Sequence, residues 1–215
     1  MNLLVTAGAT REPLDAVRFL SNVSTGATGA ALADALAARG CTVALLRGEN
    51  AVAPRAVRDV ESFSSADDLR DRLQRRLATG GVDAVIMTAA VADYRPVHWA
   101  HGKLPSAPET RTLELVRNPK ILPQLKAFSP RPLRVIGFKL TVGADASARR
   151  AAVAAQFAAG GVDAVVHNDL DEIRATATHP FYLYRSAVAV DEASPPPMLA
   201  GTAALAEALA DFLSA

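Results

Sequence analysis

The fold is decided by the stretch Ala84-Val85-Ile86-Met87-Thr88-Ala89-Ala90-Val91-Ala92-Asp93-Tyr94-Arg95-Pro96. Its first four residues are a continuous apolar run, which is typical of a parallel strand buried on both faces. The small residues that follow let a ligand approach the backbone closely. Asp93 and Arg95 then supply one charge of each sign in the crevice where open α/β sheets bind their ligands.

A second loop of this kind lies near the N-terminus. The run Thr6-Ala7-Gly8-Ala9-Thr10-Arg11-Glu12-Pro13 directly follows the apolar residues Leu3, Leu4 and Val5. The carboxyl ends of parallel strands share one edge of a sheet. The two loops therefore predict a single site of nucleotide size between them.

Strand-like and helix-like segments alternate along the chain, which predicts a parallel sheet with helices on both faces. Strands are expected at Leu3–Thr6, Thr42–Leu46, Val57–Ser62, Val82–Thr88, Leu133–Phe138 and Asp163–Val166. Helices are expected at Gly26–Arg39, Ser65–Leu77 and Thr202–Leu213, with another starting at Asn118-Pro119 and an alanine-rich one before Asp163. Phe181–Arg185 and Ala187–Val190 are expected to form a C-terminal β-hairpin. The predicted fold class is α/β: one domain over residues 1–215, a doubly wound Rossmann-like parallel sheet with a flap insertion at about 94–110.

Composition excludes several classes of protein. A net charge of +1, from 23 basic and 22 acidic residues, gives no broad electrostatic attraction to nucleic acid. No stretch approaches the ~18 uninterrupted apolar residues of a membrane span. The single cysteine, Cys41, fits a reducing compartment. We therefore expect a cytoplasmic protein that binds neither nucleic acid nor a membrane.

The connection after the first strand is long for a dinucleotide-binding fold, in which a glycine-rich turn normally leads directly into the helix. Here Gly8 is separated from the Gly26-x-x-Gly29 pair by a loop rich in guanidinium, amide and hydroxyl groups. That loop carries Arg11, Arg18, Ser21, Asn22, Ser24 and Thr25. The glycine pair allows the backbone to approach an anion at the helix start. Taken alone, these glycines are equally well explained as structural, and Asn22 as a turn residue.

Other features leave alternatives open or argue against them. The second strand ends in Leu46-Arg47-Gly48 instead of the acidic residue that binds the ribose of NAD, which makes an NAD(P)-dependent dehydrogenase the least favoured function. Asp93 alone is also explained as a solvated loop carboxylate, and Lys103 as a surface lysine. His167-Asn168-Asp169 is explained equally as a site contact or as a buried turn.

Taken together, four segments resemble the phosphopantothenate–cysteine ligase family, also called phosphopantothenoylcysteine synthetase. They are residues 6–26, residues 89–96, Asn118-Pro119-Lys120-Ile121 with Gly137-Phe138, and Asn168-Asp169. The resemblance implies a ligase that joins 4′-phosphopantothenate to L-cysteine in coenzyme A biosynthesis. The carboxylate is activated by CTP or ATP as an acyl-nucleotidylate with Mg²⁺, and pyrophosphate and the nucleoside monophosphate are released. It also implies a homodimer. Because the chain begins at the synthetase strand, we expect a stand-alone form without flavin and with a separate decarboxylase as partner.

The resemblance also assigns the site residues. Those implied to be catalytic are Asn22, Arg18 and Lys103. Those implied to bind the nucleotide are Gly8, Asp93, Lys103, Pro119, Lys120, Ile121, Leu122, Phe138 and Lys139. Those implied to bind phosphate or substrate are Ser24, Thr25, Gly26, Gly29, Ala89 and Ala90. The residues that contact the metal stay unknown.

The chain departs from the bacterial family pattern at several lysines. Ser24-Thr25-Gly26-Ala27-Thr28-Gly29 lacks one, and the alanine-rich helix lacks those expected near Gln156 and Gly160. Phe138-Lys139-Leu140 instead resembles the eukaryotic members. Our hypothesis is that Lys139 compensates and that the preferred nucleotide is not CTP. The main alternative is a non-catalytic paralogue that binds a nucleotide or pantetheine.

Overall fold

The computed structural model describes residues 1–107, 109–190 and 195–215. Eight strands form its central sheet: β1 (Asn2–Ala7), β4 (Thr42–Gly48), β5 (Asp59–Phe63), β6 (Ala84–Met87), β9 (Arg134–Thr141), β10 (Ala164–Asp169), β11 (Pro180–Tyr184) and β12 (Met198–Ala200). Their order across the sheet is β12-β11-β10-β9-β6-β1-β4-β5. The six strands from β10 to β5 pair in parallel, and β11 and β12 are antiparallel. The chain winds outward from β1 and then outward again from β6, so the doubly wound prediction is confirmed.

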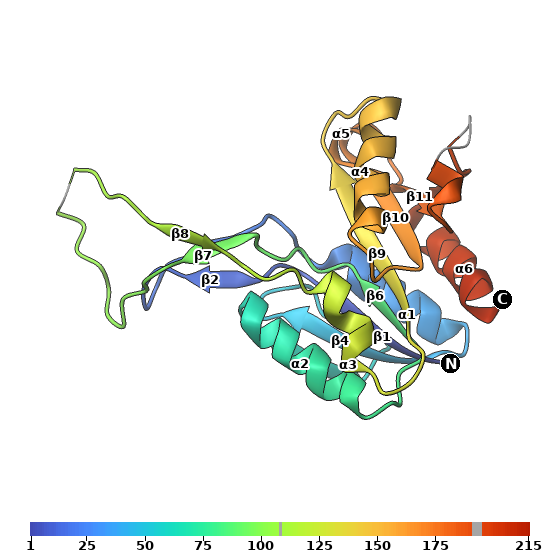
Figure 1. The fold of residues 1–215 in the computed structure, drawn as a ribbon, viewed down its shortest axis with the longest axis horizontal. Coiled ribbons are helices and arrows are strands. Elements are labelled where there is room, and N and C mark those ends of the chain that lie inside the picture. The colour runs from blue at the N-terminus through green and yellow to red at the C-terminus, as the bar shows by residue number, and fades with distance from the viewer. Residues whose placement is uncertain (108, 191–194) are drawn as a thin grey trace.

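Helices cover both faces of this sheet (Figure 1). They are α1 (Ala27–Ala38), α2 (Ala66–Ala78), α3 (Leu125–Phe128), α4 (Ala146–Ala158), α5 (Leu170–Ala175) and α6 (Gly201–Ser214). Successive residues of a strand point to opposite faces. In β1, Leu3 packs in the core layer of α1 and α6, whereas Leu4 packs in the layer of α2 and α3. Within the described ranges, every helix is too short or too polar to cross a membrane.

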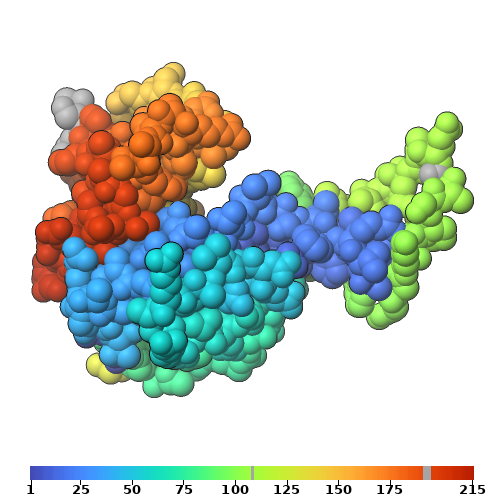
Figure 2. Space-filling model, turned by 180° about the vertical axis from the view of Figure 1, so that it is seen from behind, coloured from blue at the N-terminus to red at the C-terminus, as the bar shows by residue number. Residues whose placement is uncertain are grey.

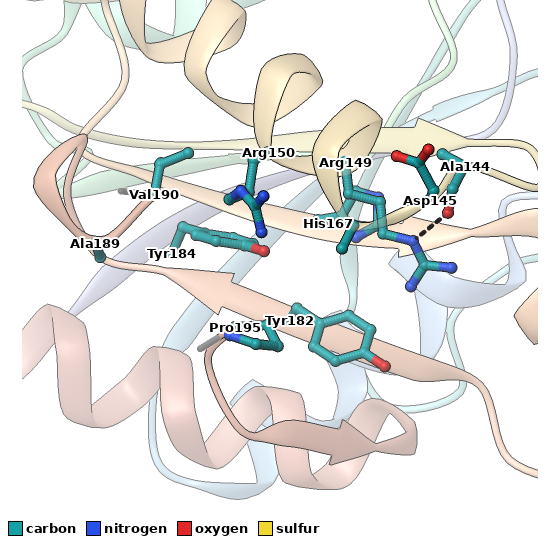
Figure 3. A pocket seen from close by; sticks show the side chains of 11 residues that line it. Ala144, Asp145, Arg149, Arg150, His167, Tyr182, Tyr184, Ala189, Val190 and Pro195 are labelled. Carbon is teal, nitrogen blue, oxygen red and sulfur yellow. Dashed lines mark hydrogen bonds between the residues drawn. The ribbon is translucent and has the colours of Figure 1, made fainter. Parts of the chain in front are cut away.

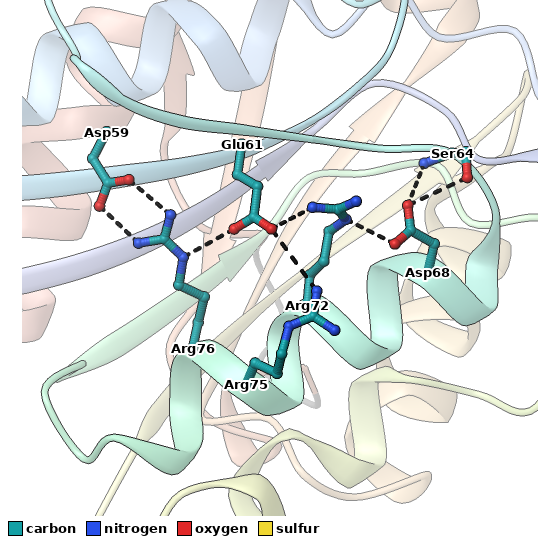
Figure 4. Close-up of polar contacts among 7 residues, drawn as sticks. All are labelled: Asp59, Glu61, Ser64, Asp68, Arg72, Arg75 and Arg76. Carbon is teal, nitrogen blue, oxygen red and sulfur yellow. Dashed lines mark hydrogen bonds and ion pairs between the residues drawn. The ribbon is translucent and has the colours of Figure 1, made fainter.

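Helix α2 begins where its sequence predicts. Ser65 caps it by accepting a hydrogen bond from the Asp68 N–H at 3.2 Å. Figure 4 shows how its arginines fasten it to the outer strand β5. Arg76 binds Asp59 through two hydrogen bonds of 2.8 Å, and Arg72 and Arg76 both pair with Glu61. The network therefore holds the sheet edge that lies farthest from α6.

Two short hairpins project from the sheet as an arm (Figures 1 and 2). One lies in the long first connection and pairs β2 (Arg11–Pro13) with β3 (Phe19–Ser21). The other pairs β7 (Tyr94–Pro96) with β8 (Leu115–Arg117). The predicted flap at about 94–110 thus begins as a strand, and its irregular part is the loop between β7 and β8. We call these hairpins and that loop the arm.

The predicted C-terminal hairpin is wrong in its second strand. Val188–Val190 forms a 3-10 helix (η2), and β11 pairs instead with Met198–Ala200. Val190 is buried against Val153 and Tyr184, so this segment packs onto α4 and cannot extend the sheet.

The predicted helix start at Asn118-Pro119 is also wrong. The Asn118 Oδ1, which a helix cap would use as its acceptor, instead accepts from the Arg95 guanidinium at 2.6 Å, and the Asn118 Nδ2 donates to the Ala92 carbonyl at 2.9 Å. A 3-10 turn (η1) at Leu122–Gln124 leads instead into α3. Asn118 therefore connects two distant loops.

Candidate functional site

The two loops that were predicted to share a site lie side by side after β1 and β6. The Thr10 N–H donates to the Ala90 carbonyl at 3.1 Å, and the Ala90 N–H donates to the Gly8 carbonyl at 2.8 Å. The Ala89 N–H donates to the Thr6 hydroxyl at 3.1 Å. These bonds bring the predicted contacts Gly8, Ala89 and Ala90 together at the point where the strand order reverses, as the sequence predicted.

The start of α1 packs directly against the Gly8 loop. Gly26, the N-cap of α1, has φ 75°, which strongly favours glycine. A Cβ there would lie 2.7 Å from the Ala51 Cβ and 3.0 Å from the Gly8 N. Ser24 and Thr25 form the turn before it, and Gly29 lies in the first turn of the helix. All four predicted phosphate-binding positions of this segment therefore lie at one helix N-terminus.

Asn22 lies at the same edge. It follows β3, and its Nδ2 donates to the Val91 carbonyl at 3.2 Å. The preceding residue, Ser21, donates its hydroxyl to the Thr10 carbonyl at 2.7 Å. The amide that was predicted to be catalytic is thus held against the loop that contains Ala89 and Ala90.

Asp93 is held in place by a buried asparagine that the sequence reading interpreted only as a helix cap. The backbone carbonyl of Asp93 accepts a hydrogen bond from the Asn118 N–H at 2.8 Å. Arg95 donates to the Asn118 Oδ1 at 2.6 Å. The exposed Asp93 carboxylate pairs with Lys120, so two residues predicted to bind the nucleotide are neighbours. Asn118 lies directly before a proline and 26 residues from its partner Ala92, so no local sequence pattern indicates that it connects the two loops.

The remaining predicted nucleotide contacts are placed less uniformly. Pro119 and Lys120 are exposed, but Ile121 is only 4% exposed and packs in the core, so its side chain is not available to a ligand. Leu122 lies within 3.1 Å of where a Gly137 Cβ would be. Phe138 follows Gly137, which pairs in register with Met87, and so lies at the same carboxyl edge. Lys139 pairs in register with His167 of β10.

Arg18 and Lys103 lie elsewhere. Arg18 belongs to the turn between β2 and β3, and its guanidinium donates to the Leu104 carbonyl at 2.8 Å. Arg11 pairs with Ser21 at the base of that hairpin, and Pro13 with Phe19 at its far end. The structure thus brings Arg18 and Lys103 together on the arm, at the opposite end of the hairpin from Asn22.

His167-Asn168-Asp169 ends strand β10, and Asp169 has a structural role there. The buried Asp169 carboxylate accepts from the N–H groups of Gly143 and Ala144 at 3.1 Å and from the Thr141 hydroxyl at 2.6 Å. Burial acts to raise the pKa of Asp169, but these hydrogen bonds hold it well below its usual range. Burial and the nearby Arg149 lower the pKa of His167. Asp169 therefore holds the loop between β9 and α4.

A separate pocket lies between α4, β10 and β11 (Figure 3). It encloses about 220 Å³, and Arg149 beside it donates to the Ala144 carbonyl at 2.7 Å. Its other lining residues are Asp145, Ala146, Arg150, His167, Tyr182, Tyr184, Ala189, Val190 and Pro195. Among the residues described, none of those that the resemblance assigned to the site lines this pocket, although His167, the other candidate site contact, does. Among all the residues that the structure describes, no three His, Cys, Asp or Glu side chains lie close enough together to hold a metal ion.

Known proteins share both the sequence and the fold. Residues 1–193 match the family model described as the DNA/pantothenate metabolism flavoprotein C-terminal domain. The coenzyme A biosynthesis bifunctional protein CoaBC of Thermococcus kodakarensis is 33% identical over 168 residues, which are 78% of this chain and 41% of that protein. The corresponding protein of Mycolicibacterium smegmatis is 45% identical over 122 residues, 55% of this chain and 29% of its own length. The chain thus spans less than half the length of these curated relatives.

Among solved structures, the C-terminal domain of a coenzyme A biosynthesis bifunctional protein CoaBC superposes with a TM-score of 0.74 at 26% identity. The superposition covers 99% of this chain and 94% of that one. A family model that matches most of the chain agrees here with a fold that matches along nearly its whole length. The chain belongs to the family of the DNA/pantothenate metabolism flavoprotein C-terminal domain.

Proposed function

We propose that this protein is a phosphopantothenate–cysteine ligase. One observation carries the proposal: the Asn22 amide, the Gly8 loop, the Ala89-Ala90 loop and the N-terminus of α1 meet at one edge of the sheet. The relatives named as coenzyme A biosynthesis proteins support the assignment. The reaction joins the carboxyl carbon of 4′-phosphopantothenate to the amine nitrogen of L-cysteine, through an acyl-nucleotidylate.

The edge suits a reaction between anions. The first turn of α1 contains no acidic residue that would oppose an anion, so the positive end of its dipole favours a phosphate there. Gly8 and Gly26 allow this helix start to pack closely against the loop after β1, because a Cβ at either position would clash with Ala51. Binding the phosphate there would place the substrate carboxylate toward Asn22 and the Ala89-Ala90 loop. Such a site acts by fixed dipoles and charges more than by acid–base catalysis.

Asn22 has a specific role in the second half of the reaction. The cysteine amine attacks the acyl carbon, the bond to the nucleotide phosphate breaks, and the nucleoside monophosphate leaves. Negative charge develops on the acyl oxygen during this attack, and an amide N–H₂ would stabilise it. The hydrogen bond from Asn22 to the Val91 carbonyl holds the amide in position without an ionised partner.

Lys120 and Lys139 are the cations that we assign to the triphosphate. Lys120 is exposed beside Asp93, and Lys139 lies at the carboxyl end of β9, next to β6. These positions would compensate for the lysines missing from α1 and α4. Mg²⁺ fits a site that supplies few protein ligands, because it commonly stays bound to water and substrate phosphates. When bound, it neutralises triphosphate charge.

We further propose a homodimer formed through the arm. The arm exposes large apolar side chains that a monomer would leave in water: Val17, Phe19, Val97, Trp99, Leu113, Leu115 and Val116. Contiguous exposed apolar surface is typical of a protein–protein interface. A separate decarboxylase that acts on the amide product is the partner expected in the same biosynthesis.

The test is pyrophosphate release by the purified protein with 4′-phosphopantothenate, Mg²⁺ and either CTP or ATP, each with and without cysteine. Turnover that depends on cysteine would support the ligase and identify the nucleotide. A strong preference for CTP would contradict our hypothesis about Lys139. No release with either nucleotide, from protein shown to be folded, would favour a non-catalytic paralogue, which the missing lysines make the second candidate. Binding of NAD(P)H would revive the dehydrogenase.

A further inference from the structure

The turn between β2 and β3 contains a buried carboxylate, Asp15. Its side chain has 0% exposure, whereas that of its partner Arg18 has 44%. It accepts hydrogen bonds from the N–H groups of Val17 at 2.9 Å, Arg18 at 2.8 Å and Leu104 at 3.0 Å. It also accepts from the Arg18 guanidinium, through Nε at 2.9 Å and through a terminal nitrogen at 2.5 Å. All these donors belong to the arm.

The bond to Leu104 differs from the others because it is not local. The bonds from Val17 and Arg18 complete the turn in which Asp15 itself lies, but Leu104 lies 89 residues further along the chain. Arg18 donates in return to the Leu104 carbonyl at 2.8 Å. On the other side of Lys103, the Gly102 carbonyl accepts from the Ala16 N–H at 3.4 Å. The backbone of Lys103 is therefore fixed on both sides by one turn.

The charge of Asp15 is stable in this setting. The Arg18 guanidinium and the Leu104 N–H hold the pKa of Asp15 well below its usual range. Replacing the carboxylate by an amide would remove the ionic acceptor and leave its donors poorly matched. Because Asp15 contacts no part of the central sheet in this set of bonds, the change would loosen the arm and leave the sheet intact.

We propose that Asp15 is a positioning residue for Lys103: it joins the turn at 14–18 and the flap segment at 100–104 into one unit and so fixes where Lys103 is presented. Asp15 thereby determines the position from which Lys103 acts on the triphosphate. This kinetic role depends on the ligase function proposed above. The structural part, the attachment of Leu104 to the turn, does not.

The kinetic test uses Asp15→Asn, Lys103→Ala and the double variant, with pyrophosphate release as the readout. Asp15→Asn is expected to lower the rate about tenfold or more, because a small misplacement of a reacting group has effects of this order. If Asp15 acts through Lys103, the double variant falls no further than Lys103→Ala alone. Losses that multiply, or an Asp15→Asn rate equal to that of the wild type, would overturn the proposal.

The structural test measures hydrogen exchange at the Leu104 amide in the full chain. Protection is expected in the wild type and is expected to be lost in Asp15→Asn. Asp34→Asn is the matched control, since Asp34 also accepts from three backbone N–H groups, at residues 55–57, but lies outside the arm. Unchanged protection in Asp15→Asn would refute the attachment. If that variant does not fold, Asp15→Glu replaces it and is expected to lose part of the protection at the Leu104 amide. Full protection of that amide in Asp15→Glu would contradict the attachment.

The two tests separate the two possible failures. A wild type that releases no pyrophosphate contradicts the proposed function, and the Leu104 amide still decides whether Asp15 holds the flap. An active wild type whose rate is left unchanged by Asp15→Asn contradicts the positioning role alone.

Discussion

The carboxyl edge of the sheet and the arm carry the two halves of the candidate site, and they are held together by different forces. The edge continues strands whose side chains are buried in two apolar layers, so its loops are fixed by the core beneath them. The arm leaves many of its large apolar side chains exposed, and its flap segment is joined to the turn at 14–18 by hydrogen bonds to the buried carboxylate of Asp15. Asn22 and Asp93 therefore lie on the rigid part, and Arg18 and Lys103 on a part whose geometry depends on a few polar contacts. The difference predicts that stability and activity can be perturbed separately.

The largest effect on stability should come from the core. Leu73 of α2 has 0% exposure, and truncating a buried leucine to alanine destabilises proteins by about 2–5 kcal/mol. Leu73→Ala should lower the free energy of unfolding by that amount in denaturant titrations. The matched change on the arm is Trp99→Ala, at a side chain that is 49% exposed, and in protein dilute enough to be monomeric it should stay within about 0.5 kcal/mol. Equal losses would mean that the arm belongs to the cooperative core.

The largest effect on activity should come from Asn22. Asn22→Asp replaces the amide donor by a carboxylate that repels the anionic intermediate. Amide formation should fall about 10²–10³-fold, the usual effect of removing one such donor, while pyrophosphate is still released in the first turnover of each enzyme molecule. The two products are measured in the same reaction. Wild-type amide formation by this variant would remove Asn22 from its assigned role, and equal loss of both products would place it in the activation step.

An intermediate effect is expected where the edge meets the arm. Asn118 is 4% exposed and serves Ala92, Asp93 and Arg95, so Asn118→Ala leaves buried groups without partners. The free energy of unfolding should fall by about 1–3 kcal/mol. The KM for the nucleotide should rise, because Asp93 and Lys120 lose their support. Gln74→Ala, at an exposed amide on α2, is the control and should change neither quantity. A stability loss without a change in KM would limit Asn118 to folding.

The same contrast explains how much could be predicted from the sequence. Buried apolar runs such as Ala84–Met87 determine the sheet locally, and the loops after them could be assigned to one edge from topology alone. The failures involve distant polar partners. In the sequence, Asn118 before a proline is typical of a helix cap, and only the structure shows that it lies beside Ala92. Likewise, the sequence gives no sign of a function for Asp15, because its partner Leu104 is distant along the chain. The alternating pattern of Ala187–Val190 predicted a strand paired with β11. Instead Val190 is buried, and β11 pairs with β12, which lies further along the chain.

The smallest effect concerns acid, and it compares one carboxylate from each region. Asp15 in the arm and Asp169 in the body both have a pKa held well below the usual value of an aspartate. A depressed folded-state pKa stabilises the fold above the unfolded pKa of about 3.9, and that contribution disappears as the pH falls toward the folded-state value. Between pH 7 and about 5, neither carboxylate should change state. Below about pH 4, the protection of the Leu104 amide against hydrogen exchange, corrected for the intrinsic exchange rate at each pH, should fall. The protection of the Gly143 amide, which donates to Asp169, should fall with it.

Asp15→Asn separates the two carboxylates in that experiment. The variant cannot titrate at residue 15, so its Leu104 amide should be unprotected at every pH while Gly143 keeps the acid transition of the wild type. Salt adds a second distinction, because Arg18 is 44% exposed and its charge is screened over about 3 Å at 1 M ionic strength. High salt should therefore weaken the protection of Leu104 slightly and leave Gly143 unchanged, since Asp169 is held by neutral donors. A Gly143 amide that responds to salt as Leu104 does would show that the arm and the body are not stabilised by different means.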